Sequence, residues 1–431
     1  MTMDEFSDYL NFIYTLKREG IKLDLGITRL FSGYLGNPEN SFESYHIAGS
    51  NGKGSTAALI YNILSERFRT GLYTSPHLID FSERIISGKV PISREYVTEF
   101  IRSNASTVHE LMAQNRNPTF FEFTTIMAFK YFQDTGAEFA SIEVGLGGRL
   151  DSTNIIKPRV SIITQVGYEH ADKLGGSLTS IATEKAGIIK DNVPAVLGDN
   201  KPEVTRTIRR IASLRNSTLY EVDRDTVASD IQYSLEGTSL KLSTPKREYK
   251  LKSNLTGVFQ PRNIASAVLA MEADESVGIT KGDIERGVAN TIWPGRLQKI
   301  SSKPTVLVDC AHNPPAANAL RISLKKLGVE NPLAVVGMLS DKDVYSFLKV
   351  MSQITDRVVF TTPDEPDRAV DPHKLENLGG KFFRELSVVP NLKEAYNLAK
   401  ESSDLVLVTG SMYLVGAIME MEKISALPFK R

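Results

Sequence analysis

Short apolar runs alternate with longer amphipathic stretches along the first half of the chain. This alternation predicts strands that are each followed by a helix, as in a parallel α/β sheet. The first helix is predicted from Phe6, Tyr9, Leu10 and Ile13, which recur at helical spacing. The predicted strands cover residues 45–48, 71–74, 139–144, 160–165 and 195–197, and the helices between them include 56–67, 96–112 and 123–135.

The hydrophobic period changes to two between residues 217 and 253. An alternation of this period is typical of strands with one buried face, so we expect a small antiparallel insert here. A helix is predicted to follow over residues 262–277. The alternating apolar positions of the insert are Ile231, Tyr233, Leu235, Leu240, Leu242, Tyr249 and Leu251.

A second series of strands and helices begins after Trp293-Pro294-Gly295-Arg296, where a helix breaker adjoins a flexible residue. We therefore expect one domain over residues 1–295 and another over 296–431. The fold class is α/β, with a parallel-sheet domain that carries the antiparallel insert and a Rossmann-like domain after it. The second series consists of strands at 305–309, 332–337, 356–361 and 405–409 and helices at 314–327, 343–354, 391–402 and 413–422.

The composition is that of a globular protein without a charge excess. Of 431 residues, 41% are hydrophobic and 24% are charged, and 51 basic residues balance 51 acidic ones. Balanced charge favours neither nucleic acid nor an anionic membrane, so we expect neither as a partner. The first residues lack the layout of a signal peptide, and Cys310 is the only cysteine. We expect a monomeric cytoplasmic protein.

The segment from His46 to Ser55 places a glycine-rich turn between a short apolar strand and a helix. Three glycines permit close backbone approach, and the start of the helix offers unpaired N–H groups. Lys53 supplies a positive charge, and Ser55 supplies a hydroxyl group for a magnesium ion. The segment therefore predicts an ATP-binding P-loop and makes the N-terminal domain P-loop ATPase-like. The glycines are Gly49, Gly52 and Gly54.

This segment departs from the usual P-loop pattern G-x-x-x-x-G-K-[ST]. Ile47 stands where the first glycine belongs, and Gly54 separates the lysine from the hydroxyl residue. The alternative interpretation is a glycine-rich turn that only caps a helix.

Three further polar residues follow predicted strands. Glu143 ends one strand, Ser75 follows another, and His170 comes after a third. Ligands bind at the carboxyl ends of strands in parallel sheets, so these side chains are expected at one edge. A carboxylate there can hold magnesium beside phosphates, and an imidazole can serve as a metal or phosphate ligand. The structural alternative for Glu143 is a strand end paired with Arg149.

Six motifs together resemble one enzyme family. In chain order they are Gly49-Ser50-Asn51-Gly52-Lys53-Gly54-Ser55, Thr74-Ser75-Pro76-His77, Glu143-Val144-Gly145-Leu146-Gly147-Gly148-Arg149-Leu150-Asp151-Ser152-Thr153-Asn154, Glu184-Lys185-Ala186-Gly187, Asp309-Cys310-Ala311-His312-Asn313-Pro314 and Thr409-Gly410-Ser411-Met412-Tyr413. They resemble folylpolyglutamate synthase, including its bifunctional dihydrofolate synthase form, in the Mur ligase superfamily. The motifs span nearly the whole chain.

The resemblance implies an ATP-dependent amide ligase. ATP would phosphorylate a carboxylate of a folate, and the amine of L-glutamate would displace the phosphate. The resemblance leaves dihydropteroate open as a second acceptor. It assigns the segment from Gly49 to Ser55, with Asn263, Arg296 and Asp309, to the nucleotide. It assigns two magnesium ions to Ser55, Ser75, Glu143, His170 and Lys185.

The resemblance also assigns catalytic roles to Lys53, Lys185, Asp309 and His312. In the family, the lysine that matches Lys185 is carbamylated and helps to hold a metal. An amine reacts with carbon dioxide only when it is neutral, so burial or nearby cations would have to depress its pKa. Without the family, Lys185 would be interpreted as a solvated helix charge.

Two positions depart from the family pattern. Phe259 stands where relatives commonly have histidine, and Cys310 replaces a glycine. The first departure removes a polar group near the nucleotide. The second places a side chain beside the phosphates, where we expect Cys310 to pack rather than to react.

Three alternatives remain open. Asp172–Gly175 and Asn200–Glu203 approach the D-x-x-G and N-K-x-D patterns of GTPases, although the second carboxylate is displaced. The others are an ATP-gated binding protein without catalysis and another Mur-type amide ligase. Residues 119–123 and 78–86 could stack a pterin, but aromatic residues there are more often part of a core.

Overall fold

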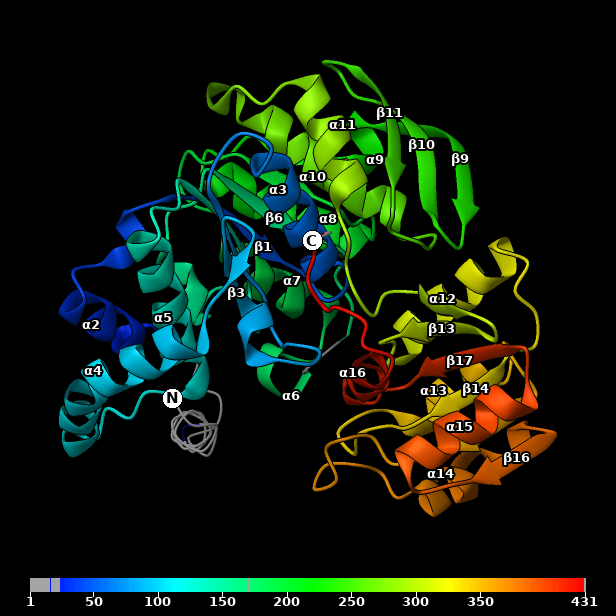
Figure 1. Ribbon diagram of the computed structural model, residues 1–431. Coiled ribbons are helices and arrows are strands. Elements are labelled where there is room, and N and C mark those ends of the chain that lie inside the picture. Colours follow the sequence, from blue (N-terminus) through cyan, green and yellow to red (C-terminus); the bar gives the residue numbers. More distant parts are fainter. Residues whose placement is uncertain (1–15, 17–23, 169–170, 430–431) are drawn as a thin grey trace.

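Two α/β units follow one another along the chain, and a small antiparallel sheet lies at the outer edge of the first (Figure 1). The structure is a computed structural model, and it describes Leu16, residues 24–168 and residues 171–429. The helix predicted around Phe6 and the candidate ligand His170 lie outside the described residues. The α/β class is confirmed, because the two large sheets are mostly parallel.

An eight-stranded sheet forms the first unit in the order β4-β3-β2-β5-β1-β6-β7-β8. The strands from β2 to β8 in that order pair in parallel, while β3 and β4 add an antiparallel edge. The five predicted strands are confirmed within two residues, and β3, β4 and β8 were not predicted. The strands are β1 (Glu43–Ala48), β2 (Thr70–Tyr73), β3 (Ile85–Ser87), β4 (Val90–Pro91), β5 (Phe139–Glu143), β6 (Val160–Ile163), β7 (Ala195–Leu197) and β8 (Leu219–Glu221).

Helices cover both faces of this sheet, which explains why its central strands are buried along nearly their whole length. One face packs against α3 and α10, and the other packs against α4 and α5 at one end and α7 and α8 at the other. The α-helices of this unit are α2 (Gly26–Tyr34), α3 (Lys53–Leu64), α4 (Arg94–Ala113), α5 (Phe120–Asp134), α6 (Ala171–Leu174), α7 (Leu178–Ala186), α8 (Pro202–Leu214), α9 (Val222–Asp225), α10 (Gln260–Ala273) and α11 (Lys281–Asn290).

The predicted antiparallel insert is confirmed as a three-stranded sheet of β9 (Val227–Ser234), β10 (Gly237–Ser243) and β11 (Glu248–Ser253). Its buried face belongs to the same core as α3 and α10. The helix after it is shorter than predicted. Helix α10 ends at Ala273, and a separate 3-10 turn covers Glu275–Val277.

A six-stranded sheet in the order β12-β13-β17-β14-β15-β16 forms the second unit. Its predicted strands and helices are confirmed within three residues, whereas β12, β16 and α14 were not predicted. Helices α12 to α14 share one core with the sheet, and α15 and α16 share another. The elements are β12 (Gln298–Ser302), β13 (Thr305–Asp309), α12 (Pro314–Lys326), β14 (Leu333–Val336), α13 (Val344–Met351), β15 (Arg357–Phe360), α14 (Pro372–Gly379), β16 (Glu385–Val388), α15 (Leu392–Ser402), β17 (Leu405–Thr409) and α16 (Met412–Met421).

After α16 the chain returns to the first unit, where its last described residues lie near α3 (Figure 1). The Pro428 carbonyl accepts hydrogen bonds from Ile292 N at 3.1 Å and from Asn62 Nδ2 at 3.1 Å. The Phe429 ring lies 6.3 Å from the Tyr61 ring, within the core around α3. This tail therefore joins the two units a second time, through noncovalent contacts with the first.

We expect Phe429→Ala to destabilise the first unit although the residue follows the second. Removing a buried ring from a core costs about 3 kcal/mol of unfolding free energy. Urea denaturation followed by circular dichroism measures this loss. Leu398→Ala, which truncates a side chain that is 38% exposed, is the control. Equal losses in the two variants would contradict a role for the tail in the core.

Candidate active site

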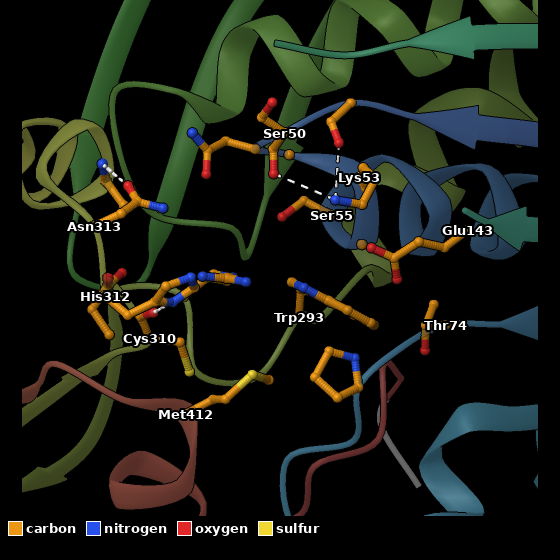
Figure 2. A pocket seen from close by; sticks show the side chains of 18 of the residues that line it. Ser50, Lys53, Ser55, Thr74, Glu143, Trp293, Cys310, His312, Asn313 and Met412 are labelled. Carbon is orange, nitrogen blue, oxygen red and sulfur yellow. Dashed lines mark hydrogen bonds between the residues drawn. The ribbon is translucent and has the colours of Figure 1, made fainter. Parts of the chain in front are cut away.

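A cleft of about 750 Å³ lies between the two units. In Figure 2, Lys53, Ser55 and Glu143 lie on one side, and Cys310, His312 and Asn313 lie on the other. All the described site residues predicted from the sequence line this cleft. They are Gly49, Asn51, Gly52, Lys53, Gly54, Ser55, Ser75, Glu143, Lys185, Asn263, Arg296, Asp309 and His312.

The glycine-rich segment leaves β1 and enters α3. Gly52 has a φ of 90° and is the N-cap of α3, so a residue with a side chain would be strained at this turn. Ser50 N donates to the Gln165 carbonyl at 2.7 Å, which fixes the turn to the end of β6. The first N–H groups of α3 therefore face the cleft, as an anion-binding turn requires.

The glycine between Lys53 and Ser55 is required by packing. A Cβ atom at Gly54 would overlap the indole ring of Trp293, which lies against the start of α3. Trp293 belongs to the segment that leads into the second unit. The departure from the usual P-loop pattern therefore makes room for the chain that links the two units.

Two lysines converge on one carbonyl oxygen. Lys53 Nζ and Lys185 Nζ each donate to the Gly49 carbonyl at 2.9 Å. Lys185 is 1% exposed, so the interpretation of this residue as a solvated helix charge is wrong. Two ammonium groups this close would repel each other with little screening. The two side chains meet at the turn between β1 and α3.

Glu143 is buried at the end of β5. Its Oε2 accepts a hydrogen bond from Ser75 N at 3.1 Å. Burial raises the pKa of this carboxyl group, and the charge of Lys53 opposes that rise. The alternative in which Glu143 pairs with Arg149 is wrong, because Arg149 NH2 bonds to Glu184 Oε1 at 2.9 Å.

Oxygen atoms of Glu143, Ser55 and Ser75 form the donor set near the P-loop. Magnesium prefers oxygen ligands and keeps several waters or phosphate oxygens in its shell, so few protein ligands suffice. Across the part of the chain that the structure describes, no three His, Cys, Asp or Glu side chains form a metal-binding group. These residues fit a magnesium ion that is shared with a nucleotide rather than one held by the protein alone.

Asp309 holds the start of the second unit. Its Oδ2 accepts from Leu297 N and its Oδ1 from Ala311 N, both at 2.8 Å. Burial raises the pKa of Asp309, while the neighbouring Arg296 guanidinium lowers it. Because both oxygens hold backbone groups, Asp309 fixes the loop that carries Arg296 into the cleft.

His312 presents one defined tautomer. Its Nδ1 lies 2.8 Å from the Cys310 carbonyl, which can only accept, so Nδ1 carries the proton. Burial lowers the pKa of His312 to about 4. The ring is therefore neutral at pH 7, and its Nε2 is a hydrogen-bond acceptor.

The lowered pKa of His312 makes folding stability depend on pH. An unfolded histidine binds a proton near pH 6.5, whereas His312 in the folded protein does so near pH 4. Stability is therefore lost as the pH falls from 6.5 towards 4, by about 1.4 kcal/mol per pH unit. We expect His312→Gln to lack this loss, measured as the difference in urea stability between pH 7 and pH 4.5. Parallel stability curves for parent and variant would contradict the lowered pKa.

The buried Cys310 packs beside the linker between the units. Its Sγ lies 2.8 Å from the place where a Cβ at Gly295 would stand. Burial raises the pKa of the Cys310 thiol to about 12, so the thiol remains protonated. The structure thus gives Cys310 a packing role.

Sequence reasoning missed two cations of the cleft. Lys342 and Arg368 line its C-terminal side, and Asp341 lies 2.8 Å from Lys342 Nζ and 3.5 Å from Arg368 NH2. Both residues follow strands of the second sheet, and this position is the signal in the sequence that could have identified them. They stand in polar loops, however, where surface charges are common.

The residues of the GTPase pattern lie away from the cleft. Asn200 and Glu203 lie at the start of α8, where neither lines the cleft.

The candidate pterin-stacking segments belong largely to hydrophobic cores. Phe123 is fully buried in the core formed by α4 and α5. Leu78 does line the cleft, and it also packs against the core of α16.

Family models match most of the chain. Residues 47–271 match the Mur ligase middle domain, and residues 295–412 match the Mur ligase, glutamate ligase domain. The chain belongs to the Mur ligase family. It is therefore an ATP-dependent carboxylate–amine ligase, and the GTPase and noncatalytic alternatives are excluded.

Relatives with this domain pair resemble the whole chain. The dihydrofolate synthase/folylpolyglutamate synthase of Bacillus subtilis (strain 168) is 31% identical, and the match covers 97% of this chain and 99% of the relative. The folylpolyglutamate synthase of Thermotoga maritima matches with a TM-score of 0.87 at 32% identity, covering 97% of each chain. The Mycobacterium tuberculosis enzyme complexed with ADP matches with a TM-score of 0.89 at 30% identity, covering 98% and 99%.

None of the described helices combines the length and apolar character that a membrane span requires.

Proposed function

We propose that this ligase joins L-glutamate to the γ-carboxylate of a reduced folate, with ATP as the energy source. The observation that carries the proposal is the cleft between the units, which joins a P-loop to the buried loop of Asp309 and His312. The names of the B. subtilis and T. maritima relatives support a folate as the acceptor.

The first unit binds the triphosphate. Backbone N–H groups at the start of α3 and the Lys53 ammonium face the phosphate oxygens, and Asn263 lies beside Gly52. Ser55, Ser75 and Glu143 would hold magnesium, with Lys185 as a carbamate, and His170 is a further candidate from the sequence. Bound magnesium neutralises charge on the phosphoryl group that is transferred.

A neutral Lys185 would relieve the repulsion at the Gly49 carbonyl. Addition of carbon dioxide to its amine releases a proton and leaves an anionic oxygen ligand. That anion would face Lys53 as an opposite rather than a like charge. The burial of Lys185 beside the P-loop supports the modification.

The second unit binds the amine substrate. Lys342 and Arg368 supply positive charge for the two carboxylates of glutamate, and Arg296 supplies it for the phosphates. The lone pair on His312 Nε2 accepts a hydrogen bond from the incoming amine. A pKa near 4 makes this ring a poor base, so His312 orients the amine rather than taking its proton.

The reaction proceeds in two displacements. A carboxylate oxygen of the acceptor attacks the γ-phosphorus, and ADP leaves. The nitrogen of glutamate then attacks the acyl carbon, phosphate leaves with the C–O electron pair, and the nitrogen loses a proton to the departing phosphate to form the amide.

Dihydropteroate is the second candidate acceptor, because the B. subtilis relative is also named a dihydrofolate synthase. The experiment that tests both is ADP release with tetrahydrofolate or dihydropteroate, each with and without glutamate. We expect full ADP release only with tetrahydrofolate and glutamate together. Release with glutamate and an unrelated Mur-type acceptor, but with neither pteridine, would contradict the folate assignment.

We further propose that the chain is a cytoplasmic monomer, divided into domains at residues 295 and 296. The start of β12 at Gln298 supports that boundary. The tail over residues 427–429 is the exception, because Leu427 and Phe429 pack in the core of the first domain.

A further inference from the structure

A buried aspartate outside the cleft is bonded to the segment that follows β6. Asp199 is the second residue after β7, and its side chain is 1% exposed and does not line the cleft. Its Oδ2 accepts a hydrogen bond from Val166 N at 2.6 Å, and its Oδ1 accepts one from Lys201 N at 2.7 Å. We propose that Asp199 is a positioning residue that fixes the phosphate-binding turn through residues 164–167.

The residues on either side of Val166 hold the turn itself. The Gln165 carbonyl accepts hydrogen bonds from Ser50 N at 2.7 Å and from Asn51 N at 3.2 Å. Ser50 Oγ accepts from Gly167 N at 2.9 Å and donates to the Gly167 carbonyl at 3.0 Å. Both neighbours of Val166 are therefore bonded to the turn, so a shift of Val166 would carry the turn with it.

Thr164 leaves the turn little room to move independently of this segment. A Cβ atom at Gly49 would lie 1.8 Å from Thr164 Oγ1, so the backbone of the turn packs directly on this hydroxyl group. Thr164 Oγ1 also donates to the Asn51 carbonyl at 2.9 Å. Close packing of this kind transmits a displacement from one group to the next. Residues 164–167 and the turn therefore form one rigid support.

The charge of Asp199 strengthens its bond to the segment. A hydrogen bond to a carboxylate is shorter and stronger than one to a neutral oxygen. Lys201 Nζ lies 2.8 Å from Asp199 Oδ2, and this ion pair compensates the buried charge. Lys201 belongs to the stretch that approaches the N-K-x-D pattern, and here it closes the turn between β7 and α8. The bond to Val166 N joins this closed turn to the segment after β6.

Nucleotide binding by Asp199→Ala tests the proposal. The variant leaves Val166 N without its acceptor, so the turn should lose its fixed position and the first N–H groups of α3 should no longer match the phosphates. Calorimetry on the full chain with magnesium would compare ADP and pyrophosphate. We expect both to bind Asp199→Ala about tenfold or more weakly than they bind the parent. The KM for glutamate, which the second unit is proposed to bind, should be unchanged.

Asp283→Ala is the matched control. Asp283 is also buried, accepts a hydrogen bond from Thr280 N at 2.8 Å and pairs with Arg67 Nε at 3.2 Å. Its loss should lower stability in urea without changing the affinity for ADP. Equal affinities for ADP in the two variants would overturn the proposal, because Asp199 would then have only a structural role.

Thr164 provides a second test should Asp199→Ala fail to fold. Thr164→Ala removes the hydroxyl group under the turn, and Thr164→Ser keeps it. We expect ADP to bind the alanine variant about tenfold more weakly than the parent and the serine variant as the parent does. Parent-like ADP binding by folded Thr164→Ala would overturn the proposal. The inference rests on the proposed phosphate-binding turn, and a parent that binds neither ADP nor pyrophosphate would refute that turn itself.

Discussion

Lys53→Ala is expected to reduce the rate of ATP-dependent ligation by about a thousandfold or more, which corresponds to about 4 kcal/mol of transition-state stabilisation. Lys53 lies on the P-loop beside the buried Glu143, and its charge would face the phosphate oxygens of ATP. The loss should appear in kcat because charge on the transferred phosphoryl group is redistributed in the transition state. Initial rates of ADP formation with a folate and glutamate measure it.

Glu143→Ala should show a loss of similar size through the metal site. The exposed residues Lys326 and Glu203 provide matched controls, since their alanine variants remove the same charges outside the cleft. Circular dichroism would establish that all four variants are folded. Ligation within about tenfold of the parent in a folded Lys53 or Glu143 variant would refute the ATP-site assignment.

Lys185→Ala is expected to abolish ligation and to regain part of it when acetate is added. The added carboxylate would occupy the space of the missing carbamate and supply the oxygen ligand that magnesium prefers. Lys185 is buried and shares the Gly49 carbonyl with Lys53. Its replacement by alanine therefore leaves a cavity beside that carbonyl, which acetate can occupy. Rates measured across a series of acetate concentrations test the rescue.

Lys185→Arg distinguishes whether Lys185 acts as a carbamate or as a positively charged side chain. A guanidinium keeps its positive charge and cannot become an anionic ligand, so this variant should remain inactive with or without acetate. Mass spectrometry of the parent should also reveal an increment of about 44 Da, the mass of carbon dioxide, that mild acid removes. Parent-like activity of Lys185→Arg would contradict the carbamate.

The hydrophobic pattern predicts those elements whose position depends on residues that are close together in the sequence. The runs that form β1, β5 and β13 are buried along all but their first residue because helices cover both faces of their sheets. The edge strands β12 and β16 are half-exposed and mixed in composition, so no periodic signal marks them. Their place in the sheet depends on neighbours that are distant in sequence.

The site was predictable where glycine, lysine and carboxylate follow strands, and not where it depends on contacts between distant segments. Gly54 is understood only when Trp293 packs on it, 239 positions later along the chain. The return of Phe429 to the core of the first unit leaves no local pattern either. Lys342 and Arg368 look like ordinary surface charges until the second sheet turns their loops into the cleft.

Transfer of oxygen from the acceptor to phosphate tests the central claim most directly. Tetrahydrofolate with an ¹⁸O-labelled γ-carboxylate would be incubated with the chain, ATP, magnesium and glutamate, and the released phosphate would be analysed by mass spectrometry. An acyl phosphate predicts one ¹⁸O atom in each phosphate that accompanies amide formation, because the carboxylate oxygen that attacks the phosphorus leaves with it. Unlabelled phosphate released together with the amide product would contradict ligation through an acyl phosphate at this site.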